Sequence, residues 1–342
     1  MLRHATAMLL IAAGASALLA LARSPLEPRW SVDDPGRGGH VTAAAERAGQ
    51  VVAARQDGSL VVRRDGAWED GPGLPEAARS TVLLGAGPLR AGTRDGVLEL
   101  RDGEWRRMDT GEAPEGRISG LAAGDGRLLA AGQRGVWERP ADGAWRFLGH
   151  PAPGLPVYRI HASADGTLHA GVIEAGVHVR APGDDGWEPD RDGLPADVKI
   201  LSFLALDDDT LLAGTDQGLY RQDGGPGAEW EAVSGALERL RILSLARERD
   251  RLLLGNDDGV LAAPLGADGA LPERPEWREV RARAEQLDAG VAWIIPDAAD
   301  GPWIAAGSLY RLRSGLDATW LTLALVGPLL LIAGGGLLVR RR

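Results

Sequence analysis

The chain has 342 residues, 44% of them hydrophobic, so it is long and apolar enough to bury a substantial core. Its formal net charge of -10 argues against a nucleic-acid partner, because phosphate binding needs a clustered basic surface. The absence of cysteine excludes disulfides, thiolate metal sites and cysteine nucleophiles.

The first segment of the chain, residues 1–24, has the pattern of an export signal. Arg3 and His4 form a basic start, an apolar run extends from Ala5 to Ala22, and the run ends in an Ala-x-Ala-like motif. This pattern predicts a signal peptide, although the run is also long enough to stay uncleaved as a signal anchor. In either case the basic end starts in the cytoplasm and the chain that follows is exported.

Residues 25–317 contain a unit that recurs seven times with a period of about 40 residues. In each unit an apolar strand is followed by a strand that opens on glycine, as in "TLLAGTDQGLYR". These glycines are Gly58, Gly96, Gly135, Gly176, Gly218, Gly259 and Gly307. A further apolar run, such as "RILSLARE", precedes each pair of strands.

A strand marked by tryptophan ends each of the first six units, after a turn rich in Asp and Gly that is typical of a hairpin. These tryptophans are Trp68, Trp105, Trp145, Trp187, Trp230 and Trp277. The seventh unit lacks such a strand, whereas Trp30 lies 38 residues before Trp68 with no unit in front of it. Trp30 therefore belongs to the last unit.

Four strands per unit of this length predict an all-β, seven-bladed β-propeller. The N-terminal strand is expected to supply the outer strand of the last blade, which closes the ring without leaving an unpaired edge. Two β-sandwiches are the alternative. The ring is favoured because each unit has two apolar faces that only its neighbours in a stack can cover.

The last apolar run, residues 318–339, predicts a transmembrane helix. As a helix this uncharged segment spans about 33 Å, against a bilayer hydrocarbon core of about 30 Å. The tail at 340–342 consists of three arginines, which the positive-inside rule places in the cytoplasm. We therefore expect a cell-membrane protein whose propeller lies on the extracytoplasmic side, periplasmic or extracellular.

The units carry a family resemblance in their Gly-Leu-Pro linkers at Gly73, Gly154 and Gly193, their "LLAGT" and "GLYR" strands and their Trp-marked turns. This combination resembles BNR/Asp-box and photosystem II assembly-factor-like β-propeller repeats, and is similar to the sensor propeller repeats of bacterial two-component regulators. The resemblance covers residues 27–314, but turns such as "RDGAW" have lost the Ser and Thr of the Asp-box. It implies the fold and leaves hydrolases, sensors and assembly factors open as functions.

Candidate chemistry is sparse. We expect no catalytic residue and no cofactor, because no position stands out from the repeat. A sialidase-like glycosidase needs a Tyr nucleophile with a carboxylate partner, and only Tyr158, Tyr220 and Tyr310 are available. The last two occupy repeated strand positions.

Three histidines are weak candidates for a metal site, and otherwise no metal is expected. His161, His169 and His178 fall on successive strands of the fourth unit, and would share an ion only if they share a face. The favoured function is a protein-binding, assembly or ligand-sensing module whose partner is another membrane or exported protein. A hydrolase acting on a glycan is the alternative.

Overall fold

The computed structural model describes Thr6 and residues 29–36, 39–75, 78–124, 126–141, 143–233, 237–280, 287–296, 298–299 and 301–313. The chain divides into one unit at Trp30–Arg311 and a second made of Met1–Arg29 with Leu312–Arg342. The predicted signal segment (1–24), transmembrane helix (318–339) and tail (340–342) lie outside the described residues, Thr6 apart. Among the residues that are described, no helix is both long and apolar enough to cross a membrane.

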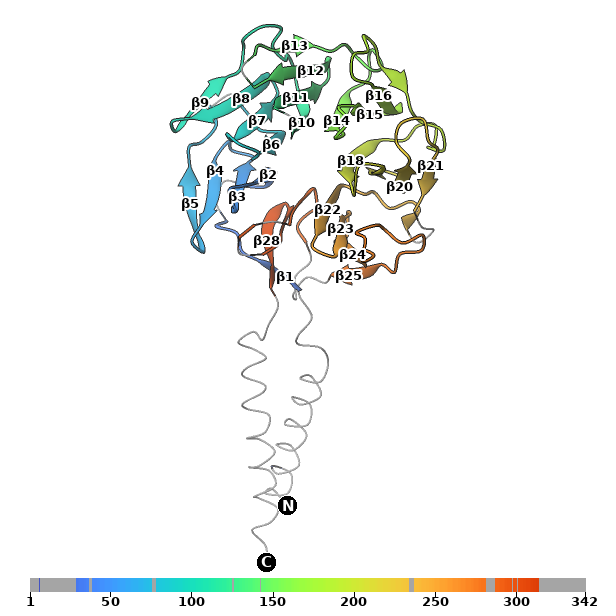
Figure 1. The fold of residues 1–342 in the computed structure, drawn as a ribbon. Helices are drawn as coiled ribbons and strands as arrows, with labels where there is room; N and C mark the ends of the chain where they lie inside the picture. The colour runs from blue at the N-terminus through green and yellow to red at the C-terminus, as the bar shows by residue number, and fades with distance from the viewer. Residues whose placement is uncertain are drawn as a thin grey trace, which may run out of the picture. The chain divides into compact units, whose positions relative to one another are not determined.

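The described strands pair into seven four-stranded sheets, arranged as the blades of a ring (Figure 1). This confirms the seven-bladed propeller. The innermost strands of blades 1 to 7 are β2 (Val41–Arg47), β6 (Val82–Leu84), β10 (Ile118–Gly124), β14 (Val157–Ala162), β18 (Ile200–Ala205), β22 (Ser244–Glu248) and β26 (Trp293–Ile295). The second strands are β3 (Gln50–Arg55), β7 (Arg90–Thr93), β11 (Arg127–Gly132), β15 (Leu168–Val172), β19 (Thr210–Thr215), β23 (Arg251–Gly255) and β27 (Trp303–Ala306).

The third and fourth strands complete each blade. The third strands, which the repeated glycines precede or open, are β4 (Leu60–Arg64), β8 (Gly96–Arg101), β12 (Gly135–Pro140), β16 (Gly176–Arg180), β20 (Gly218–Asp223), β24 (Val260–Pro264) and β28 (Ser308–Arg313). The outer strands are β5 (Ala67–Gly71), β9 (Glu104–Arg107), β13 (Arg146–Phe147), β17 (Glu188–Pro189), β21 (Trp230–Ala232), β25 (Arg278–Val280) and, for blade 7, β1 (Arg29–Val32).

The two faces of the ring carry different turns, because neighbouring strands in a blade are antiparallel. One face carries the connections between blades, such as residues 148–156, and the turns between second and third strands, such as that at Arg94. We term it the linker face. The opposite face, termed the hairpin face, carries the other turns, including the one at 207–209.

Strand β1 closes the ring as predicted. The last sheet has the order β1-β28-β27-β26, so the N-terminal strand is its outer strand. Just after β1, the Asp33 amide donates to the Leu309 carbonyl oxygen at 3.0 Å. Trp30 is completely buried. Closure therefore rests on both backbone pairing and the burial of a large aromatic side chain.

The apolar core lies between blades. Each cluster of buried side chains draws from two neighbouring blades, for example Val51 of blade 1 and Trp303 of blade 7. There the Trp68 and Trp303 rings meet edge to face, with centroids 5.5 Å apart. Neighbouring blades thus cover each other's apolar faces, as expected from the argument that favoured a ring over two β-sandwiches.

The repeated tryptophans also tie neighbouring blades by hydrogen bonds. Five indole N–H groups donate to a backbone carbonyl in the segment that enters their own blade: Trp68 to Asp33 (3.0 Å), Trp105 to Pro72 (2.7 Å), Trp145 to Met108 (2.9 Å), Trp187 to Leu148 (3.0 Å) and Trp230 to Asp190 (3.1 Å). The buried indole nitrogens of Trp30 and Trp277 have no such partner among the described residues. This bond explains why tryptophan, rather than another large apolar residue, recurs in the series.

Six of the seven repeated glycines have a positive φ, and Gly259 is the exception. Gly135 shows why. It has φ 127°, and a Cβ there would lie 2.6 Å from the Gly149 carbonyl oxygen. The backbone of the connection to blade 4 passes so close that a side chain does not fit.

The variant Gly135→Ala is expected to lower the free energy of unfolding by about 2–4 kcal/mol, from the unfavourable φ and the clash together. Gly259→Ala is the matched control, because no atom lies within 4 Å of its Cβ position, and it should change stability by less than about 0.5 kcal/mol. Urea unfolding followed by tryptophan fluorescence measures both. Equal stabilities of the two variants would contradict this account of the repeat.

Candidate functional site: a basic mouth of the central channel

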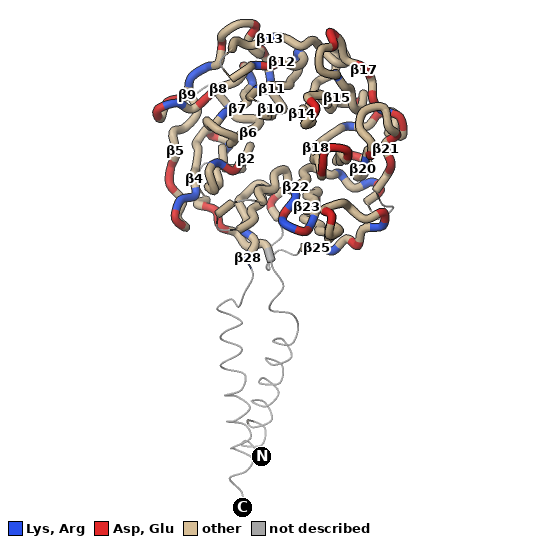
Figure 2. Tube along the Cα trace, in the orientation of Figure 1, with Lys and Arg blue, Asp and Glu red and all other residues tan. Residues whose placement is uncertain are grey.

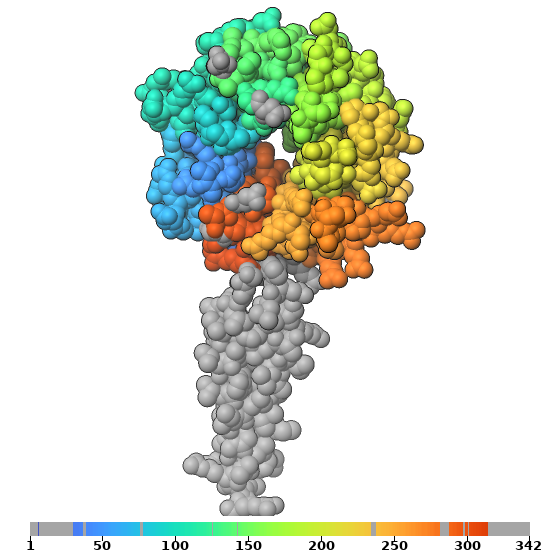
Figure 3. All heavy atoms as spheres, viewed as in Figure 1, coloured from blue at the N-terminus to red at the C-terminus, as the bar shows by residue number. Residues whose placement is uncertain are grey.

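The innermost strands surround a channel at the centre of the ring, which the space-filling view shows as a hollow (Figure 3). It holds a cavity of about 250 Å³ lined by residues of six blades. Side-chain hydroxyls link neighbouring inner strands along its wall. Ser244 Oγ donates to the Val291 carbonyl oxygen at 2.7 Å, and Ser202 Oγ to that of Ile242 at 3.5 Å. The wall is therefore tied together from blade to blade.

At the linker face the channel opens into a second cavity of about 450 Å³, which we term the basic mouth. Its lining includes five arginines and one histidine: Arg79, Arg94, Arg117, Arg159, Arg241 and His40. None of the residues that line it is Asp or Glu. The concentration of positive charge is notable in a chain with 38 basic and 48 acidic residues.

Four of these basic residues come from one position of the repeat. Each immediately precedes a buried residue that either begins an innermost strand or lies two residues before it, namely Val41 after His40, Ser80 after Arg79, Ile118 after Arg117 and Ile242 after Arg241. Lys199 holds the same position before Ile200, but it pairs with Asp216 at 3.8 Å and does not line the mouth. The sequence therefore contains a signal for the mouth that the Gly and Trp series do not include, namely a basic residue in phase before the inner strand.

Most of the charge at the mouth is not neutralised by the protein. Arg241 Nη1 meets Asp257 Oδ1 at 3.1 Å in a half-exposed ion pair. Arg79, Arg94 and Arg117 are exposed, and no ion pair or side-chain hydrogen bond joins them to another described residue. Three guanidinium groups are thus free to bind an anion.

Arg159 lies where the mouth meets the channel and lines both. Its Nη1 donates to the carbonyl oxygens of Ser119 (3.1 Å) and Tyr158 (3.0 Å), and its Cζ lies 4.2 Å from the centroid of the Tyr158 ring. Burial lowers the pKa of the Arg159 guanidinium below its ordinary value, because desolvation disfavours the charged form. A held, partly desolvated guanidinium of this kind suits carboxylate or phosphate oxygens, which it can bind through two parallel N–H bonds.

The three candidate histidines do not form one site. His161 and His169 face each other across β14 and β15, with ring centroids 5.9 Å apart. His178 pairs instead with Ala170, the neighbour of His169 in β15, and so lies on the other side of the sheet. Throughout the described ranges, no group of three or more His, Cys, Asp or Glu is placed to hold a metal ion.

The predicted repeat residues lie outside the mouth. None of the seven series glycines or seven series tryptophans is among the residues that line it. Their observed contacts hold strands and blades together, whereas the basic residues belong to the ends of the inner strands. In this chain the repeat positions that define the fold are separate from those that form the mouth.

Comparison with known proteins finds similar structures but no similar sequences. No protein-family model matches the chain, and no curated protein sequence matches it. The extracellular domain of the hybrid two-component system BT4673 from B. thetaiotaomicron superposes with a TM-score of 0.69 at 13% identity, over 83% of this chain and 39% of that one. YCF48 from Cyanidioschyzon merolae superposes with a TM-score of 0.62 at 13% identity, and the match covers 84% of this chain and 98% of YCF48. The chain shares their fold.

A third similar structure is that of an enzyme. A catalytically inactive virginiamycin B lyase from Staphylococcus aureus, solved with quinupristin, has a TM-score of 0.67 at 13% identity and covers 84% of this chain and 99% of its own. At these identities the likeness concerns the fold alone. The chain spans about two fifths of the two-component-system chain that it matches.

Proposed function

We propose that this chain is a non-catalytic binding module that is anchored in the cell membrane, displays its propeller on the extracytoplasmic side and recognises an acidic region of another membrane or exported protein at the basic mouth. One observation carries the proposal: five arginines converge on a cavity whose lining includes no carboxylate. Unpaired like charges repel one another, so such a cluster is stabilised when an anion binds.

The chemistry of the mouth favours binding over catalysis. Tyr158 is the one tyrosine in its lining, and Arg159 rather than a carboxylate stacks on its ring. A sialidase-like tyrosine nucleophile needs a carboxylate partner, and no Asp or Glu is among the residues that line the mouth. Tyr310 is buried, and burial raises the pKa of Tyr220. The glycan hydrolase alternative therefore has less support.

The similar structures support a binding role without deciding the partner. One of them is YCF48 bound to a D1 peptide, with a TM-score of 0.64 at 16% identity. Another is the extracellular part of a two-component system. By analogy with the peptide-bound propeller and with the extracellular domain of the two-component system, we propose a binding or sensing role for this chain. The lyase shows that an enzyme also uses the fold.

The proposal is tested by affinity purification of the tagged full-length chain from detergent-solubilised membranes, with mass spectrometry of what co-purifies. The variant R79E/R94E/R117E should lose at least about 90% of a stoichiometric partner, because repulsion replaces attraction at the mouth. The control R106E/R274E/R278E changes the net charge equally at exposed positions outside the mouth and should retain the partner.

Three outcomes would contradict the proposal: equal loss in both variants, retention in both, or the absence of any stoichiometric protein from the wild-type sample. Nuclease treatment of the wild-type sample tests the expectation that no nucleic acid is involved. Loss of the partner after that treatment would also overturn the acidic-protein assignment.

A further inference from the structure

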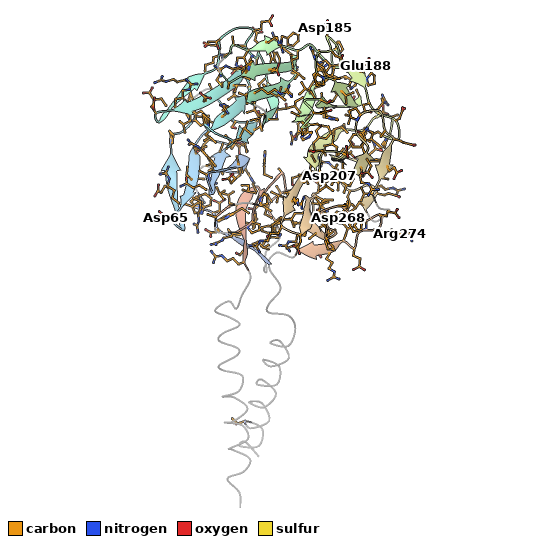
Figure 4. The ribbon with its side chains drawn as sticks, viewed as in Figure 1. Asp65, Asp185, Glu188, Asp207, Asp268 and Arg274 are labelled. Carbon is orange, nitrogen blue, oxygen red and sulfur yellow. The ribbon has the colours of Figure 1, made fainter. Side chains whose placement is uncertain are left out.

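A third cavity, of about 700 Å³, lies on the hairpin face between blades 4 and 5, and we term it the acidic cleft. Its lining includes Asp165 and the turn Asp207–Asp209, and neither Lys nor Arg belongs to the lining. Figure 2 shows the acidic segment beside β18 and β20, and Figure 4 places Asp207 near the inner edge of the ring. The charge of this cleft is thus opposite to that of the basic mouth.

Gln222 provides a second, independent observation at the cleft. It is 1% exposed and lines the cavity. Its Nε2 donates to Asp190 Oδ2 at 3.0 Å and to the Ala228 carbonyl oxygen at 2.8 Å. Since both partners are acceptors, the amide orientation is fixed and Oε1 is an acceptor, yet no described residue donates to it. A buried acceptor without a donor indicates that a donor comes from outside the protein.

The histidines at the cleft do not counter its negative charge. Burial lowers the pKa of His169 to about 4, and burial also lowers the pKa of His161. Both rings are therefore neutral at pH 7. His169 Nε2 lies 3.0 Å from Ser163 Oγ, while its buried Nδ1 has no partner among the described residues. The cleft thus combines exposed carboxylates with unpaired buried polar atoms.

The arrangement favours an organic cation over a metal ion. None of the described carboxylates and histidines form a group of three able to hold a metal. Asp207 Oδ1 already accepts the N–H groups of Asp209 (3.0 Å) and Thr210 (2.8 Å), which holds it within its own turn. A cation with several N–H donors can use the separate carboxylates and the amide oxygen without the close, regular ligand shell of a metal.

We propose that the acidic cleft binds a primary amine or guanidinium group, with Asp208 and Asp209 supplying negative charge and Gln222 Oε1 accepting an N–H. Two sources share this chemistry, namely a free di- or polyamine and a Lys or Arg side chain of a partner protein. The cleft lies on the opposite face from the basic mouth, so this site is separate from the proposed partner site.

The test is isothermal titration of the full-length chain in detergent at about 0.15 M salt, which screens non-specific surface attraction. The probes are 1,5-diaminopentane, a tetralysine peptide and calcium chloride. We expect saturable binding of at least one amine probe, with at least tenfold weaker affinity in D208N/D209N. Both aspartates are exposed, so this variant should keep the wild-type melting temperature.

The matched control is D184N/D185N, which removes two charges from an exposed turn on the same face, away from the cleft (Figure 4). It should bind as the wild type does. Tighter binding of diaminopentane assigns the site to a small amine, and tighter binding of tetralysine assigns it to a protein side chain. No saturable binding of either amine, calcium binding alone, or equal loss in both variants would overturn the proposal.

Discussion

Deletion of residues 27–33 is expected to lower the melting temperature by at least about 10 °C, since each kcal/mol shifts a domain of this size by a few degrees. The deletion removes β1, and with it the outer strand of blade 7. It also removes Trp30, which is 0% exposed, and the Asp33 carbonyl that accepts the Trp68 indole N–H at 3.0 Å. The edge of β28 is then left unpaired, which also favours aggregation.

Two single substitutions within β1 test whether the loss of stability comes from loss of ring closure or from any change near the N-terminus. Trp30→Ala should cost about 3–5 kcal/mol, because it leaves a large cavity beside β28. Val32→Ala is the control, since Val32 is 46% exposed, and it should cost less than about 0.5 kcal/mol. Thermal melts of the full-length chain in detergent measure all three variants. If the deletion melted like the wild type, the ring would not depend on β1.

The fold could be predicted because each unit repeats local signals. The Gly-opened strand, the Trp-marked strand and the period of about 40 residues are all visible in the sequence, and the position of Trp30 before the first unit indicated closure. The hydrogen bond from each of five indoles to the segment entering its blade was not predicted. It joins residues 33 to 40 positions apart in sequence, and no local pattern shows it.

The basic mouth could not be predicted from the sequence in the same way as the fold. Its residues Arg79 and Arg241 are far apart in sequence, and only closure of the ring brings them to one cavity. Basic residues recur at the same repeat position before several inner strands, and this pattern could have predicted where they lie. It could not have predicted whether carboxylates nearby neutralise them. That no carboxylate lines the mouth follows from the arrangement of all the blades. Similarly, the register of β15 against β16 separates His178 from His169, and register was not predictable from spacing.

The structure places cavities of opposite charge on the two faces of the ring. His161 lines both the central channel and the acidic cleft, while Arg159, two residues earlier in β14, lines the channel and the basic mouth. One inner strand therefore contributes to all three cavities. The basic mouth and the acidic cleft share no lining residue, so the two proposed sites can be mutated and tested independently.

Asp34→Ala is expected to cost about 3–5 kcal/mol of stability, because it leaves a buried guanidinium without its counter-charge. Asp34 Oδ1 and Arg55 Nη2 lie 2.5 Å apart, and their side chains are 5% and 2% exposed. Asp34 Oδ2 also accepts the Leu309 N–H at 2.8 Å, so one carboxylate joins the entry to blade 1 with β28 of blade 7. The ion pair therefore lies at the point where the ring closes.

The double variant Asp34→Ala/Arg55→Met should recover part of that loss, because removing both charges avoids an unpaired ion in the core. Glu69→Ala is the control for charge loss as such. Its partner Arg64 lies 2.8 Å away, but both side chains are more than half exposed, and the change should cost less than about 1 kcal/mol. Urea unfolding compares the three. If the double variant were less stable than Asp34→Ala, the guanidinium would stabilise the closure by itself, and the pairing argument would fail.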